Sequence, residues 1–175
     1  NPIVLGSMEL LEYIAYKSAT RLIGLSDGMV EGIKKHGILE SKITCIPNGC
    51  DLEIFNDKNN SIRRADFNNN DLVCIYSGTH GIANGLDAIL LVAEELIKRK
   101  VKNIKFVLIG DGKLKENLLT ISNDKKLNNI IFLNPVKKKE LAELMSSCDI
   151  GMQILANIPA FYNGTSPNKF FDYIS

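Results

Sequence analysis

The chain has 175 residues, of which 45% are apolar and 23% are charged, and its formal net charge is +1. This length fits one domain, or one domain with part of another, and the composition is typical of a globular protein with a hydrophobic core. A nearly neutral chain has no broad basic surface, so we expect no nucleic-acid partner. No apolar run reaches the 18 residues typical of a membrane span.

The cysteines and histidines predict no metal site. None of the cysteine pairs has C-x-x-C spacing, and the four residues are Cys45, Cys50, Cys74 and Cys148. Reduced thiols in a cytoplasmic protein are the simplest interpretation. There are only two histidines, which excludes a histidine-based metal cluster. The sequence starts at Asn1-Pro2 with neither a Met nor a signal peptide, so we expect the chain to begin within a longer protein.

The first part of the chain alternates between helix-like and strand-like patterns. The pattern predicts helices at 9–20 and 26–36 and strands at 21–25 and 43–46. Ser26 or Asp27 is a good N-cap for the second helix, and Pro47-Asn48-Gly49 predicts a turn. We expect residues 1–56 to end one α/β domain and the Asn-, Asp- and Arg-rich residues 57–70 to be a linker.

The remaining residues, 71–175, predict most of a second domain. Short continuous apolar runs predict strands at 72–77, 104–109, 130–133 and 149–155. Helical spacing predicts helices at 86–98, 114–121 and 137–145, and a further helix near Pro167. This alternation predicts an α/β fold, a Rossmann-like open parallel sheet with helices on both faces.

Ligands of such a sheet bind at the carboxyl ends of its strands, and the first candidate loop follows the strand at 72–77. Its glycines allow close approach of the backbone, and its free N–H groups favour phosphate. The alternative is a long turn without a ligand. The candidate binding residues of this loop are Gly78, Thr79, His80, Gly81 and Asn84.

The second candidate loop is Gly110-Asp111-Gly112, which follows the strand at 104–109. With Lys115 it reads G-x-G-x-x-K, whereas a dinucleotide fingerprint has a third glycine at that point. We therefore favour a turn leading into a helix over an NAD site.

The third candidate loop, 163–172, combines small polar residues with a lysine and a carboxylate. Its candidate residues are Thr165, Ser166, Lys169 and Asp172. Lys169 could hold a diphosphate, and Asp172 could accept hydrogen bonds from vicinal sugar hydroxyls. The alternative is a capped helix in which these two side chains form a surface ion pair.

Taken in order, these segments resemble the retaining glycosyltransferases of family four, which have the GT-B fold of two facing Rossmann-like domains. Ile46-Pro47-Asn48-Gly49-Cys50-Asp51, followed by Phe55, resembles the end of the N-terminal domain. Tyr76-Ser77-Gly78 resembles the opening of the donor domain, 107–112 its central strand ending at Gly110, and 131–136 its next strand. The resemblance covers nearly the whole chain.

The resemblance implies roles for the candidate residues. The loop 78–85 would face the donor diphosphate, with Gly110 beside it. The backbone of Leu133, Asn134 and Val136 would hold the base. Asp172 takes the place of the carboxylate that ends the E-x7-E motif and binds the ribose hydroxyls. Gly164 stands where the first glutamate is expected, and Asn84 where a basic residue is expected.

Residues 165–173 resemble the branch that builds bacterial surface polysaccharides, which includes transferases for N-acetylated deoxyhexosamines such as fucosamine. In that branch Lys169 and the backbone of Thr165 and Ser166 would take over contacts to phosphate or sugar.

The resemblance implies a glycosyltransferase that takes a nucleotide-diphosphate sugar, UDP-linked, and transfers the sugar to a growing bacterial glycan with retention. It implies no metal and no cofactor. Its partners would be the donor and a glycan or lipid-linked saccharide acceptor. The expected location is the cytoplasm. The resemblance also allows peripheral association with the inner face of the membrane through the N-terminal half.

Because the chain stops at Ser175, inside the expected last motif helix, we expect residues 1–175 alone to be inactive. The catalytic residues are not identified from the sequence. Two alternatives remain: a UDP-sugar 2-epimerase, and a non-catalytic nucleotide-binding module.

Overall fold

The computed structural model describes residues 2–55, 66–162 and 164–175. The chain forms two compact units, one of residues 1–49 with 158–167 and the other of residues 50–157 with 168–175. The expected linker at 57–70 lies largely outside the described residues. The division into domains at 1–56 and 71–175 therefore stays a prediction.

The first unit is built from two helices, a pair of short parallel strands and two 3-10 turns. In chain order these are α1 (Pro2–Ser18), β1 (Leu22–Gly24), α2 (Asp27–Lys35), η1 (Glu40–Lys42), β2 (Ile43–Cys45) and η4 (Pro159–Phe161). The predicted cap is present, since the Ser26 hydroxyl accepts a hydrogen bond from the Met29 amide at 3.3 Å. The first helix was expected from Glu9, but it starts at Pro2, because proline lacks the N–H that a first helical turn leaves unpaired.

The second unit holds a four-stranded parallel sheet. Its elements are α3 (Leu52–Phe55), β3 (Leu72–Ser77), η3 (Ile82–Asn84), α4 (Asp87–Lys98), β4 (Ile104–Ile109), α5 (Lys115–Asp124), β5 (Ile130–Leu133), α6 (Lys138–Ser146), β6 (Ile150–Gly151) and α7 (Asn168–Ile174). The strand order is β5-β4-β3-β6, and all neighbours are parallel. The sequence-based prediction of a parallel α/β sheet is confirmed.

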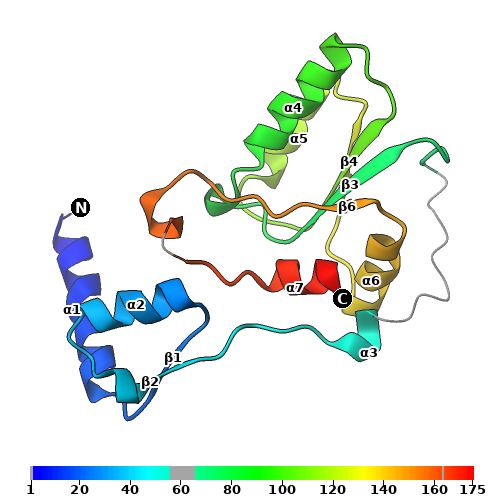
Figure 1. Ribbon diagram of the computed structural model, residues 1–175. Helices are drawn as coiled ribbons and strands as arrows, with labels where there is room; N and C mark the ends of the chain where they lie inside the picture. The colour runs from blue at the N-terminus through cyan, green and yellow to red at the C-terminus, as the bar shows by residue number, and fades with distance from the viewer. Residues whose placement is uncertain (1, 56–65, 163) are drawn as a thin grey trace. The chain divides into compact units, whose positions relative to one another are not determined.

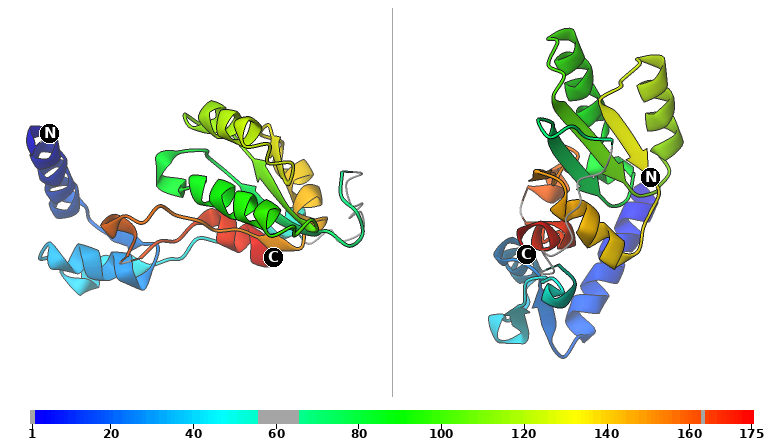
Figure 2. Two further views of the ribbon diagram at one scale, coloured as in Figure 1. Left: turned by 90° about the horizontal axis from the view of Figure 1, so that it is seen from above. Right: turned by 90° about the vertical axis from the view of Figure 1, so that its right-hand side faces the viewer.

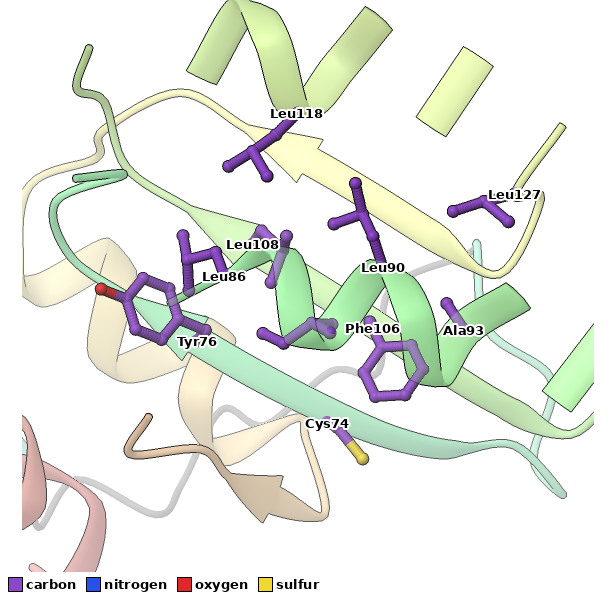
Figure 3. Packing of buried hydrophobic residues seen from close by; sticks show 10 residues of the cluster. Cys74, Tyr76, Leu86, Leu90, Ala93, Phe106, Leu108, Leu118 and Leu127 are labelled. Atoms are coloured by element: carbon purple, nitrogen blue, oxygen red, sulfur yellow. The ribbon is translucent and has the colours of Figure 1, made fainter. Parts of the chain in front are cut away.

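Helices cover both faces of this sheet, as predicted (Figure 1). Helices α4 and α5 pack against one face through a core that includes Tyr76, Leu90, Leu108 and Leu118 (Figure 3). The other face carries Val73, Ile75 and Val107, against which α6 and Tyr173 of α7 pack. Figure 2 shows this layered arrangement from two further directions. Continuous apolar runs in β3 and β4 follow from burial on both faces.

The last strand is much shorter than expected. We predicted a strand over 149–155, but only Ile150 and Gly151 pair with β3. The following residues Met152 and Ile154 pack against the core cluster that contains Tyr76 and Leu108. Their apolar character therefore reflects packing at the sheet edge and not strand pairing.

The strand order creates a switch point between β3 and β6. The chain moves from β3 outward through β4 to β5, and it then returns to the other side of β3 to form β6. In open parallel sheets, ligands bind outside the carboxyl ends of the strands at such a point. The loop that begins at Gly78 leaves β3 there.

Two further observations concern disulfide bonds and membrane-spanning helices. None of the four cysteines forms a disulfide bond among the described residues. In the part of the chain that the structure describes, no helix is both long and apolar enough to span a membrane.

Candidate functional site

The loop after β3 is tied by its backbone to the loop after β4. The His80 amide donates to the Asp111 carbonyl at 2.8 Å, and the Leu114 amide donates to the His80 carbonyl at 3.0 Å. The loops touch most closely at Gly110, where an added Cβ would lie 1.9 Å from the Gly78 oxygen. The second candidate loop is thus a turn leading into α5, and Gly110 is needed because the Gly78 backbone packs directly on it.

Lys169 reaches the first loop from the start of α7. Its ammonium group donates to the Tyr76 hydroxyl at 2.9 Å and approaches the Asn84 side-chain oxygen at 3.4 Å. The end of its side chain lies against Gly78, where an added Cβ would meet Cε at 2.7 Å. The structure therefore brings together Gly78, Asn84 and Lys169, three residues that sequence analysis had placed in two separate loops.

The charge of Lys169 is not neutralised within the described residues. Its nitrogen contacts the neutral oxygens of Tyr76 and Asn84, and no acidic side chain pairs with it. Burial lowers the pKa of Lys169. The alternative of a surface ion pair with Asp172 does not hold for the described structure. A half-buried cation without a counter-charge, at the switch point of a parallel sheet, is suited to binding an anion.

Thr79 contributes its backbone to the same cluster. Its carbonyl oxygen accepts hydrogen bonds from the Tyr76 hydroxyl at 2.9 Å and from the Asn84 side-chain nitrogen at 2.8 Å. Gly81 begins η3, and its carbonyl accepts from the Asn84 amide at 3.1 Å. The loop is thereby folded back on itself above the end of β3.

His80 lies inside the unit and is completely buried. Its ring lies between those of Tyr76 and Phe132, and neither ring nitrogen has a hydrogen-bond partner among the described residues. Burial lowers the pKa of His80, and the charge of Lys115 lowers it further. The imidazole is therefore neutral at pH 7, and its known contacts are with the loop framework.

Lys115 joins the second loop to the end of β5. Its nitrogen donates to the Gly110 carbonyl at 2.8 Å, to the Leu133 carbonyl at 3.3 Å and to the Asn134 side chain at 2.8 Å. Val136 packs against the core cluster on the other face of the sheet, which contains Ile75 and Val107. Three of the predicted backbone-binding residues thus lie on one segment whose position Lys115 fixes relative to Gly110.

Asp172 lies apart from the Lys169 cluster. It lines a hollow of about 210 Å³ with residues of α6 and β6, among them Met145 and Gly151. Burial raises the pKa of Asp172, while the charge of Lys138 opposes this. Among the described contacts, none joins Asp172 to the loop after β3.

Thr165 and Ser166 belong to the first unit. The Asn48 side chain donates to the Ser166 carbonyl, and the Asn48 amide donates to the Ser166 hydroxyl at 3.4 Å. The predicted turn at 47–49 is therefore tied to this segment. Asn163, the first residue of the third candidate loop, lies outside the described residues.

Two tyrosines that sequence analysis did not choose as candidates, Tyr76 of β3 and Tyr173 of α7, place their hydroxyls near the end of β3. The Tyr76 hydroxyl links Lys169 to Thr79, and the Tyr173 hydroxyl accepts a hydrogen bond from the Ser77 amide at 3.1 Å. Burial raises the pKa of both phenols. Tyr76 stands in an apolar run, so its sequence context predicts only a core residue. In the chain as described, no group of three acidic, histidine or cysteine side chains is arranged to hold a metal ion.

Comparison with solved structures supports the fold. WaaG, a glycosyltransferase involved in lipopolysaccharide biosynthesis, matches 78% of this chain with a TM-score of 0.61 at 16% identity. HepE of Anabaena, in complex with UDP and glucose, matches 82% with a TM-score of 0.60 at 16% identity. Sucrose-phosphate synthase of Thermosynechococcus elongatus matches 82% with a TM-score of 0.63 at 14% identity.

The chain spans only 37–40% of the length of these three structures. The comparison with curated proteins finds no match. The profile of the family described as "Glycosyl transferases group 1" matches residues 57–153, which is more than half of the chain. With a parallel sheet that corresponds to one half of a GT-B enzyme, the chain belongs to the group 1 glycosyltransferases of family four.

Proposed function

We propose that this chain carries the donor-binding part of a glycosyltransferase that uses a UDP-linked sugar and transfers it, with retention, to a growing bacterial glycan. The observation that carries the proposal is the position of Lys169. Its cation is half-buried, has no acidic partner among the described residues and lies against Gly78 where the chain leaves β3. A diphosphate is the part of a nucleotide sugar that would pair with it.

The loop after β3 and Lys169 would bind the diphosphate together. Gly78 allows a phosphate to approach the backbone, while Thr79, His80, Gly81 and Asn84 shape the loop. As the sugar–phosphate bond breaks, negative charge grows on the departing diphosphate. A cation fixed at that position in a partly desolvated site stabilises the charge without having to reorganise.

The base would lie on the segment from Leu133 to Val136. The Leu133 carbonyl already accepts from the Gly110 amide at 3.2 Å and from Lys115. The base would then be read by other backbone groups of Asn134 and Val136. Asp172 would accept hydrogen bonds from the ribose hydroxyls.

The choice of UDP draws support from similar proteins. Solved structures of HepE contain UDP or UDP-glucose, and a TarM variant of S. aureus was solved with UDP. The phrase at 165–173, which resembles the branch that builds bacterial surface polysaccharides, supports an N-acetylated deoxyhexosamine as the sugar.

A ligand panel tests the assignment of the base. UDP, GDP, ADP and NAD would each be added to the protein, and the melting temperature recorded. We expect the largest rise with UDP. A larger rise with NAD would return the Gly110 loop to consideration as a dinucleotide site and would contradict the proposal.

Turnover by the full-length protein tests the reaction. It should release UDP from a UDP-N-acetylhexosamine in a manner that depends on a saccharide acceptor. Free N-acetylmannosamine as the product would indicate an epimerase instead. Binding of UDP without any donor cleavage would indicate a non-catalytic module.

A further inference from the structure

We propose that Tyr76 is a positioning residue that holds Lys169 at the site of the diphosphate and couples it to the loop after β3. The inference rests on the proposed function, because it assigns a role within the same site. It assigns a role to Tyr76, which was not among the candidate binding residues chosen from the sequence.

Tyr76 contacts Lys169 in two ways. Its hydroxyl accepts a hydrogen bond from the ammonium group at 2.9 Å, and the ammonium nitrogen lies 4.3 Å from the centre of its ring. The negative face of an aromatic ring attracts a cation, most strongly where water is excluded. Tyr76 itself is completely buried, so the support that it offers is rigid.

The same hydroxyl extends the connection to the loop backbone. It donates to the Thr79 carbonyl, which also accepts from Asn84, and the Asn84 oxygen in turn faces Lys169 at 3.4 Å. The four residues thus form a closed ring of hydrogen bonds. A lysine side chain is long and flexible, and this ring restricts its ammonium group to one place before a ligand arrives.

The hydroxyl of Tyr76 is separable from its role in the core. The ring packs in the cluster with Leu86 and Leu108 (Figure 3), while the hydroxyl forms hydrogen bonds with Lys169 and Thr79. Tyr76→Phe therefore keeps the core packing and the ring face beneath Lys169. It removes the hydroxyl that bonds directly to both Lys169 and Thr79, and it leaves the connection through Asn84.

Three variants separate positioning from general support. UDP and uridine are titrated into the wild type, Tyr76→Phe, Lys169→Ala and Tyr173→Phe, and also into the double variant that combines Tyr76→Phe with Lys169→Ala. Tyr173→Phe is the matched control, because its hydroxyl also bonds at the end of β3 but contacts Ser77 and not Lys169. Each variant's melting temperature is recorded first.

We expect Tyr76→Phe to lower affinity for UDP about three- to tenfold, which corresponds to one hydrogen bond, and to leave uridine unchanged. Lys169→Ala should lower affinity for UDP more, and Tyr76→Phe should add nothing in that background, since the group that it positions is gone. Tyr173→Phe should leave the ratio of the UDP and uridine affinities as it is in the wild type.

Other outcomes would contradict either the positioning role of Tyr76 or the proposed diphosphate site. If Lys169→Ala weakens UDP selectively and Tyr76→Phe does not, the positioning role is wrong and the proposed function stands. If neither variant changes the ratio, the diphosphate site itself is misplaced. Equal selective losses in Tyr76→Phe and Tyr173→Phe would indicate general support of the loop and would also contradict the positioning role.

A second readout does not depend on the stability of the phenylalanine variant. Fluorotyrosine at position 76 carries a fluorine next to the hydroxyl that contacts Lys169 and Thr79. Its ¹⁹F resonance should shift when UDP binds and should stay in place with uridine. An unchanged resonance at saturating UDP would contradict the proposal.

Discussion

Gly78→Ala should weaken UDP binding by displacing Lys169, while leaving the fold in place. A Cβ at this position would lie 2.7 Å from Cε and 3.1 Å from Nζ of Lys169, and both distances are too short for a stable contact. The atoms concerned are the far end of a flexible side chain, so Lys169 would move away from Tyr76. Gly78 also has a φ of +142°, where a side chain costs about 1–3 kcal/mol of stability.

The loss of binding follows from the loss of the lysine contact. A hydrogen bond that involves a charged group contributes about 1.5–3 kcal/mol, so UDP affinity should fall roughly ten- to hundredfold. Uridine, which lacks the diphosphate, should bind as before. Isothermal calorimetry measures both affinities, and urea denaturation measures the expected loss of stability.

Gly81→Ala is the matched control in the same loop. Its Cβ would lie 3.5 Å from the Thr79 methyl carbon, which is an ordinary van der Waals contact, and Gly81 has an extended backbone with a φ of −117°. We expect UDP affinity to change less than about twofold there, well below the effect of losing one hydrogen bond to a charged group. The decisive comparison uses Lys169→Ala as the background, in which Gly78→Ala should cost no further affinity. An equal loss in both backgrounds would refute the argument.

Three further predictions concern Asp172, the need for a metal ion, and His80. Asp172→Ala should lower UDP affinity about ten- to hundredfold and abolish discrimination against 2′-deoxy-UDP, which competitive titration would detect; unchanged values would make Asp172 a surface residue. Turnover by the full-length protein should persist in EDTA, because hard cations need oxygen ligands that no described carboxylate cluster supplies, and an absolute need for a divalent ion would contradict this. Burial lowers the pKa of His80 below 6.5 in the folded state, so the unfolded state binds the proton more readily and stability should fall as pH drops from about 6.5 towards the lower folded value. Urea titrations at several pH values should show this decline, and a His80→Gln variant that keeps the full decline would assign it to another group.

The sheet could be predicted because its central strands, β3 and β4, are buried on both faces. The runs 72–77, 104–109 and 130–133 are short and largely apolar, and the structure has strands at these same residues. The run at 149–155 has a similar composition, yet only two of its residues pair with β3. An apolar composition indicates that a segment is buried, but a buried segment need not pair as a strand. The length of β6 therefore could not be predicted from its composition.

The loops that hold the candidate residues could be chosen from the sequence, but the contacts between those residues could not. Gly78 and Lys169 were both chosen for phosphate chemistry, but 91 positions separate them, and their contact follows from where α7 lies on the sheet. Tyr76 was missed because a tyrosine in a buried strand has the same local pattern whether or not its hydroxyl is used. The ligand-binding role of Gly110 stays a prediction, and its packing against the Gly78 backbone could not be predicted from the sequence.

The central claim is that Lys169 and the loop after β3 bind the diphosphate of a nucleotide. The most direct test titrates UDP and uridine into the wild type and Lys169→Ala by calorimetry, after equal melting temperatures have been confirmed. The wild type should bind UDP more tightly than uridine, and Lys169→Ala should lose most of that advantage, about ten- to hundredfold. No heat with UDP on folded wild-type protein, or the same ratio of UDP to uridine affinity in both proteins, would contradict the account.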